Sequence, residues 1–166
     1  MIFPGAEEQS AGSAMESKTA DRRFMALALA LGRRGLGRTH PNPAVGAVVV
    51  KDGVIVGRGW TQAGGRPHAE PEALKRAGEA ARGATLYVTL EPCSHFGKSP
   101  PCVDAVIAAG IARVVWRSRT PIRKWRGRAM RSYGMPGLRS MSGFARWRRR
   151  TPMRGISGAS ASTVRM

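Results

Sequence analysis

The chain has 166 residues and a formal net charge of +18, so it is long enough to bury the core of one domain without disulfide staples. Its longest apolar run, Phe24 to Leu31, is far shorter than the about 20 residues that cross a bilayer. The first 20 residues contain three glutamates and no apolar core, so they do not resemble a secretory signal, and we expect a cytoplasmic protein with reduced thiols and no membrane partner.

The charge is unevenly distributed along the chain. The first 115 residues contain 14 of the 28 basic residues and all 10 acidic ones, whereas the remainder contains 14 basic residues and no acidic residue. This pattern predicts three regions: a disordered N-terminal extension over 1–20, with Met15 as an alternative start to Met1, a folded domain over 21–115, and a basic tail without regular structure over 116–166.

The folded region is expected to begin with a helix and a hairpin. After Asp21, a candidate N-cap, apolar residues recur at helical spacing until a group of glycines. The apolar positions are Phe24, Leu27, Ala28 and Leu31, and the glycines are Gly32, Gly35 and Gly37. Two prolines exclude regular structure over 39–43. A β-branched run over 45–50, a turn at Asp52-Gly53 and apolar residues over 54–57 then predict a β-hairpin.

Helices and strands alternate after the hairpin. A helix is expected from His68, because Pro71 is tolerated in a first turn. A buried strand over 85–90, a helix opened by Pro101 and a strand over 111–116 follow. This order predicts an α/β fold with three layers, in which helices cover both faces of a central sheet.

One histidine and both cysteines lie at predicted element ends. His68 opens a helix, Cys93 follows a strand and Cys102 opens the next helix. One imidazole and two thiolates supply three ligands to a zinc ion that binds four, and an open fourth position is typical of a catalytic zinc. Glu70, two residues after His68, can act there as general acid and base on a water molecule. Its alternative role is that of a surface glutamate in a first helical turn.

Three segments resemble the pyrimidine deaminase domain of riboflavin biosynthesis. They are Pro41 to Val50, Gly83 to Leu90 and Glu91 to Cys102. His-x-Glu followed by Pro-Cys is a zinc deaminase signature, and the long Cys-x8-Cys spacing resembles the enlarged loop of this family. The resemblance runs from about Arg23 to Val115. It implies a cytidine-deaminase-like fold with a mixed central sheet, a Zn²⁺ cofactor, and hydrolytic release of ammonia from 2,5-diamino-6-(5-phosphoribosylamino)pyrimidin-4(3H)-one.

The resemblance also implies substrate-binding residues. Asn42, His95 and Lys98 match family positions that bind substrate. An amide can pair with a pyrimidine edge, and a lysine suits a phosphate. The alternatives are a turn asparagine and a solvated loop lysine. Thr61 stands where many relatives carry a histidine, so one expected polar contact is weaker or replaced.

The resemblance stops after Val115, where the family continues with an Asp-Pro-Asn-Pro-like turn and a Val-Ala-Gly segment. The codons of Thr120 to Gly127, read one base earlier, permit Asp-Pro-Asp-Pro-Lys-Val-Ala-Gly. We therefore hypothesise a reading-frame shift near residue 116, which leaves the C-terminal part of the domain incomplete.

Resequencing the coding region tests the frame-shift hypothesis. We expect a one-base insertion or deletion near codon 116, with the family's continuation restored in the corrected frame. An intact reading frame with no in-frame reductase sequence downstream would contradict the hypothesis.

Two other functions are compatible with the sequence. The first alternative is an inactive deaminase fragment. The second is a zinc-containing nucleic-acid-binding protein that uses its arginine-rich tail. A nucleoside or tRNA-base deaminase is disfavoured by the long loop that holds His95 and Lys98. We favour the riboflavin-pathway deaminase, with a small-molecule partner and without nucleic acid, and leave monomer and homo-oligomer open.

Overall fold

The computed structural model describes residues 6–94, 96, 99–118 and 145–148. Expectations for the other residues, including His95, Lys98 and most of the basic tail, lie outside this described part. Among the described helices, none combines the length and apolar character needed to cross a membrane.

One mixed sheet forms the centre of the described structure, with the strand order β2-β1-β3-β4-β5. β1 (Gly46–Lys51) is antiparallel to both β2 (Val54–Trp60) and β3 (Thr85–Leu90). β3 is parallel to β4 (Arg113–Ser118), which is antiparallel to β5 (Ala145–Arg148). The mixed sheet and its N-terminal hairpin were both predicted from the sequence and are confirmed.

The turn between β1 and β2 explains why these two strands pair. Asp52 and Gly53 both have positive φ, at 50° and 78°. A two-residue hairpin turn of this kind matches the right-handed twist of its flanking strands and favours glycine and aspartate. The Asp-Gly pair therefore fixes the hairpin locally.

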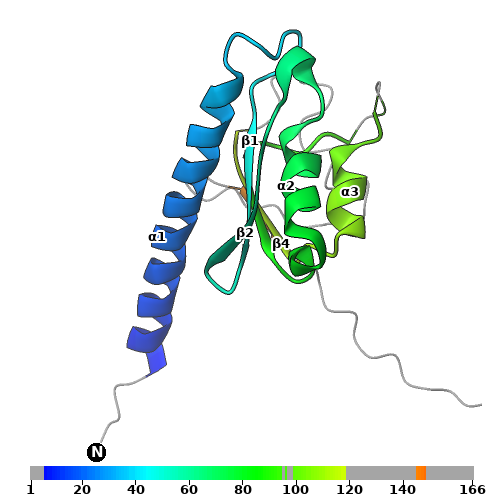
Figure 1. The fold of residues 1–166 in the computed structure, drawn as a ribbon. Helices are drawn as coiled ribbons and strands as arrows, with labels where there is room; N and C mark the ends of the chain where they lie inside the picture. The colour runs from blue at the N-terminus through cyan, green and yellow to red at the C-terminus, as the bar shows by residue number, and fades with distance from the viewer. Residues whose placement is uncertain (1–5, 95, 97–98, 119–144, 149–166) are drawn as a thin grey trace, which may run out of the picture.

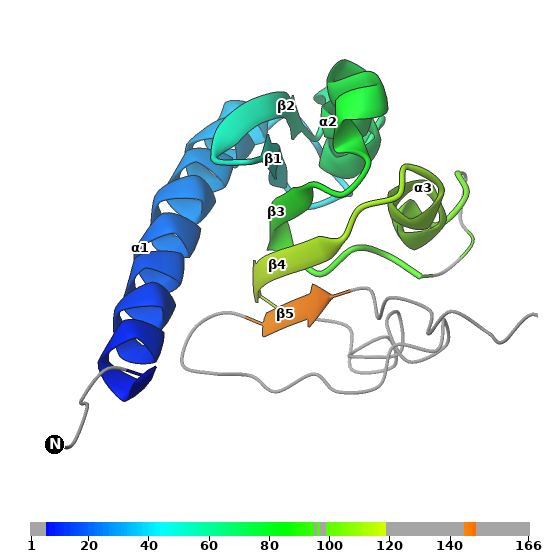
Figure 2. The ribbon, with the colours of Figure 1, turned by 90° about the horizontal axis from the view of Figure 1, so that it is seen from below.

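Helices cover both faces of the sheet (Figures 1 and 2). α1 (Ala6–Gly32) packs on one face through Phe24, Met25 and Ala28. α2 (Ala69–Ala77) and α3 (Cys102–Ala108) pack on the other face around a second apolar cluster. Three short 3-10 turns complete the described elements, at Arg33–Gly35, Ala63–Gly65 and Gly78–Ala81. The three-layer prediction is confirmed.

The first helix corrects the expectation of a disordered N-terminus. α1 begins at Ala6, so the helix includes most of the region that was expected to lack structure. The segment 6–20 contains alanine, glutamate, glutamine, methionine and lysine and no proline, a composition with good helix propensity. Asp21 is consequently an interior residue of the helix and not its N-cap.

Asp21 instead belongs to a buried polar cluster that links α1 to the sheet. Its carboxylate accepts a hydrogen bond from the Tyr87 hydroxyl at 2.9 Å and one from Arg113 Nη2 at 2.6 Å. Burial, followed by the nearby Asp21 charge, raises the pKa of Tyr87 to about 12. A buried carboxylate requires a charged partner, and Arg113 supplies it from β4.

β5 corrects the expectation for the tail in part. The tail was predicted to lack regular structure, but residues 145–148 pair antiparallel with β4. Ala145 and Trp147 alternate in the sequence with two arginines, the period of two that is typical of a strand, and backbone groups make the pairing with β4. The residues on either side of β5 lie outside the described part.

Candidate metal centre and active site

Three different elements bring the candidate metal ligands together. His68 immediately precedes α2 as its N-cap residue, Cys93 follows β3, and Cys102 is the first residue of α3. The backbone holds both ends of the cysteine loop together, since the Val103 N–H donates to the Cys93 carbonyl at 3.2 Å. The three residues are 25 and 9 positions apart in sequence but meet where these elements converge.

Close packing of α2 on β2 fixes the position of His68. A Cβ atom at Gly59 would lie 2.2 Å from the Ala69 carbonyl oxygen, and one at Gly57 would lie 2.2 Å from the Ala73 carbonyl oxygen. Only glycine allows the helix backbone to approach the strand this closely. The first turn of α2 is therefore anchored on the sheet next to the site.

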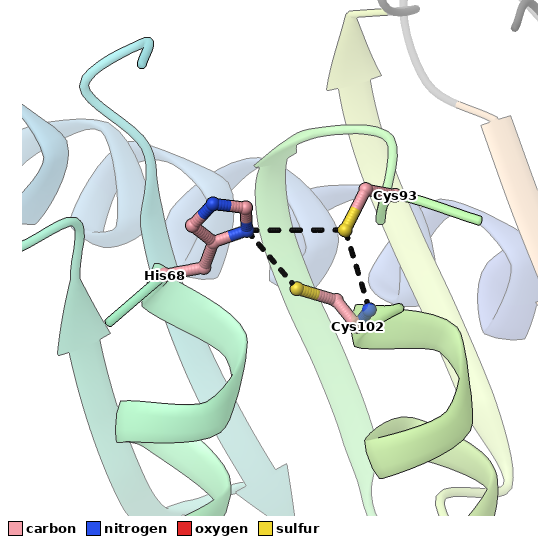
Figure 3. A group of neighbouring side chains, drawn as sticks. All are labelled: His68, Cys93 and Cys102. Carbon is pink, nitrogen blue, oxygen red and sulfur yellow. Dashed lines mark hydrogen bonds between the residues drawn. The ribbon is translucent and has the colours of Figure 1, made fainter. Parts of the chain in front are cut away.

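The geometry of the three side chains fits a zinc ion (Figure 3). His68 Nδ1 lies 3.2 Å from Cys102 Sγ and 3.8 Å from Cys93 Sγ, and the three ligand atoms all lie within 4.8 Å of one another. Tetrahedral zinc at its usual bond lengths separates nitrogen and sulfur ligands by about 3.6 Å. Both cysteines are free thiols, so the donor set and its spacing suit zinc with one position left open.

Without metal, the pKa values of the two cysteine thiols are shifted in opposite directions. The pKa of Cys93 is lowered to about 4, first because the Cys102 thiol donates a hydrogen bond to it and then because His68 does. The pKa of Cys102 is raised, because its proton is held by Cys93 and because the side chain is buried. The hydrogen bond with Cys93 likewise raises the pKa of His68. The cluster therefore already holds one thiolate at neutral pH, on Cys93.

Alkylation of the metal-free chain tests this distribution of charge. We expect iodoacetamide to modify Cys93 at a rate that changes little between pH 6 and pH 8, because its thiolate is already formed. An unperturbed thiol would react roughly 80-fold faster at pH 8 than at pH 6. Cys102, which is 2% exposed, should be spared, as peptide mass spectrometry can determine.

The denatured chain and the Cys93→Ser variant are the controls for this experiment. Both cysteines of the denatured chain should show the steep pH dependence, and the folded variant should be modified little. Preferential modification of Cys102, or a steep pH dependence at Cys93 in the folded chain, would contradict the assignment.

Glu70 lies in the first turn of α2, two residues from His68, and is only 4% exposed. Burial, followed by the charge of the nearby Cys93 thiolate, raises the pKa of its carboxyl group to about 7. A hydrogen bond with Cys102 opposes this shift and places Glu70 beside the cluster. A carboxyl group with a pKa near neutrality can both take and give a proton at that pH. The surface role considered for Glu70 is wrong.

The structure describes Asn42 but not its predicted partners in substrate binding, His95 and Lys98. Asn42 Nδ2 donates to the Gly65 carbonyl at 2.8 Å, which joins the loop before β1 to the loop that leads to His68. This contact uses the amide nitrogen of Asn42, and the amide oxygen can still accept a hydrogen bond. Substrate binding by Asn42, His95 and Lys98 stays a prediction.

Two further contacts near the site were not evident in the sequence. Thr61 is buried, and its hydroxyl accepts a hydrogen bond from the Val45 N–H at 3.0 Å. This hydrogen bond satisfies a backbone donor at the end of the hairpin. Arg66 Nη1 donates to Ser99 Oγ at 2.5 Å, which connects the segment before His68 to the cysteine loop. Long-range contacts of loop residues have no periodic pattern that would predict them.

Known proteins are similar to this chain in sequence and in fold. Residues 18–118 match the cytidine and deoxycytidylate deaminase zinc-binding region. RibD of Escherichia coli, a riboflavin biosynthesis protein, is 56% identical over 118 residues, which are 71% of this chain and 32% of that protein. The structure of Acinetobacter baumannii RibD has a TM-score of 0.66 at 45% identity and covers 68% of this chain and 32% of its own.

A shorter relative is matched over most of its length. The diaminohydroxyphosphoribosylamino-pyrimidine deaminase of Buchnera aphidicola subsp. Schizaphis graminum is 49% identical over 110 residues, which are 66% of this chain and 75% of that protein. With a mixed sheet between helices and a histidine and two cysteines in one cluster, the chain is a zinc-binding deaminase domain of the cytidine and deoxycytidylate deaminase type. It belongs to the diaminohydroxyphosphoribosylaminopyrimidine deaminase family. The chain spans about a third of the length of the RibD proteins that it matches.

Proposed function

We propose that the chain catalyses the zinc-dependent hydrolytic deamination of 2,5-diamino-6-(5-phosphoribosylamino)pyrimidin-4(3H)-one. The observation that carries this proposal is the convergence of His68 Nδ1 on both cysteine sulfurs with the buried Glu70 beside them. The names of the relatives supply the substrate class. We infer that the reaction belongs to the cytoplasm, where reduced thiols remain free to bind metal.

In the proposed reaction His68, Cys93 and Cys102 would hold zinc, which would supply Lewis-acid chemistry, and Glu70 moves the proton. Glu70 takes a proton from a water molecule while the oxygen of that water forms a bond to the ring carbon that carries the amino group. Glu70 then delivers the proton to the departing nitrogen, the carbon–nitrogen bond breaks, and ammonia leaves. The pKa of Glu70, about 7, suits both proton transfers.

The remaining contacts in this proposal position the substrate. Asn42 offers its amide to the pyrimidine edge, and His95 and Lys98 in the cysteine loop offer polar and cationic groups to the ribose phosphate. This assignment requires a small phosphorylated substrate and no nucleic acid. A free nucleoside would leave the cationic group of Lys98 without a phosphate partner.

Ammonia release from the purified, zinc-loaded chain tests the proposed function. We expect turnover of the phosphoribosylated diaminopyrimidine, weak turnover of the same compound after removal of its phosphate, and none of cytidine or deoxycytidylate. Release of ammonia only from a nucleoside would contradict the proposed substrate. Stoichiometric zinc without ammonia from any of these compounds would instead support the inactive deaminase fragment.

A further inference from the structure

A groove of about 610 Å³ lies at the β2 edge of the sheet, and its lining includes none of the three candidate metal ligands. β2 is the edge strand and lies between α1 and α2 (Figures 1 and 2). Both helices and the strand contribute to the lining. The lining includes Leu27, Arg34, Ile55, Arg58, Trp60 and Arg76.

Apolar side chains line part of this groove. Leu27 on α1 lines it and is 40% exposed, and Ile55 on the edge strand lines it as well. These two side chains offer an apolar surface to aliphatic groups of a partner.

Three arginines give the same groove a positive charge. The guanidinium groups of Arg34 and Arg76 lie over the Trp60 ring, 4.9 and 5.1 Å from its centroid. Arg58 lines the groove from the edge strand, and its side chain is exposed. Arg76 also pairs with Glu72 at 3.1 Å, so the cluster retains an excess of positive charge.

The open edge of β2 presents donors and few free acceptors. The Arg58 carbonyl accepts a hydrogen bond from Arg76 Nη1 at 2.6 Å, and the Trp60 carbonyl accepts one from Gln62 Nε2 at 2.7 Å. These bonds occupy backbone acceptors that an added strand would need. An occupant must therefore bring acceptors of its own, and carboxylates meet this requirement for both the backbone and the guanidinium groups.

We propose that this groove binds an acidic segment of another protein, with aliphatic side chains against Leu27 and Ile55 and carboxylates on Arg34 and Arg58. The chemistry of the partner follows from the lining of the groove, which combines apolar residues with arginines. A second copy of this chain is disfavoured as occupant, because symmetric pairing of two β2 edges would bring the Arg58 side chains toward one another without an acidic residue between them.

Binding of a defined peptide to the full chain tests this proposal. The probe is a fluorescein-labelled peptide with two leucines between flanking glutamates, followed by fluorescence anisotropy. One comparison peptide has serines in place of the leucines, and another has lysines in place of the glutamates. We expect saturable binding of the first peptide, weakened by salt, and binding at least about tenfold weaker for both comparisons.

Variants locate the binding surface. Arg58→Glu and Leu27→Ser should each weaken binding of the probe at least about tenfold, whereas Arg22→Glu, an equal charge change on α1 outside the groove, should alter it less than about twofold. Unchanged zinc content and circular dichroism show that each variant is folded. Absence of saturable binding, equal effects of Arg58→Glu and Arg22→Glu, or a dimer that Leu27→Ser dissociates would each overturn the proposal.

Discussion

Replacing Glu70 with glutamine is expected to lower the deamination rate by about 10² to 10⁴-fold without loss of zinc. The amide has nearly the shape of the carboxyl group but cannot take a proton from water, and a positioned acid–base group contributes a factor of this size. Glu70 is not among the three clustered ligands, so the metal content should remain at one zinc per chain. Single-turnover ammonia release and metal analysis measure the two quantities.

Glu72→Gln provides a matched control for this substitution. Glu72 belongs to the same first turn of α2, but it pairs with Arg76 on the surface. The same change from carboxyl group to amide is made, and we expect a change in rate of less than about threefold, because exposed pairs contribute little. Equal losses of activity in the two variants would show that Glu70 acts through the charge or stability of the helix and not through proton transfer.

Replacing Asp21 with alanine is expected to lower the free energy of unfolding by about 3 to 5 kcal/mol. This loss is typical when one partner of a buried ion pair is removed and the other is left uncompensated. Here the remaining partner is Arg113, which is 9% exposed, and Asp21 itself is 1% exposed. Because domains are stable by only about 5 to 15 kcal/mol, the variant should be close to unfolding in urea titrations.

A double-mutant cycle separates the ion pair from the packing of α1. Asp21→Ala combined with Arg113→Met removes both charges, and we expect it to recover part of the stability lost in Asp21→Ala alone. Tyr87→Phe removes only the hydroxyl that donates to Asp21 and should cost about 1 kcal/mol. A double variant that is destabilised by the full sum of the single effects would contradict a coupled pair.

The elements that position the site were predictable because each has a local cause. The Asp52-Gly53 turn determines the hairpin, and the apolar periodicity after His68 determines α2. Pro101 precedes the first turn of α3, where the missing N–H has no cost. These patterns depend on residues a few positions apart, so the sequence alone identifies them.

The errors in the prediction concern contacts between distant residues. Asp21 has the chemistry of an N-cap, but 92 positions separate it from the arginine that it binds inside the fold. β5 pairs with β4, and its alternation of apolar and charged residues covers only four positions inside an arginine-rich segment. The hydroxyl of Thr61 accepts a hydrogen bond from the Val45 N–H, 16 positions away, a contact that the sequence did not indicate. Spacing in the sequence does not report contacts of this kind.

The site was predictable to the extent that its chemistry depends on residue type. His68, Cys93 and Cys102 were assigned as ligands from their order and setting, and the structure brings their donor atoms within 4.8 Å. The raised pKa of Glu70 was not foreseeable, because it arises first from the burial of this side chain in the folded chain. The family match ends at residue 118, close to the position at which we place the frame shift.

X-ray absorption at the zinc edge of the zinc-loaded chain tests most directly whether His68, Cys93 and Cys102 form one metal centre. We expect one zinc per chain with two sulfur ligands at about 2.3 Å and nitrogen or oxygen ligands at about 2.0 to 2.1 Å. The Cys102→Ser variant should retain a single sulfur ligand and bind zinc more weakly. A spectrum without sulfur ligands, or one unchanged in this variant, would contradict the zinc centre.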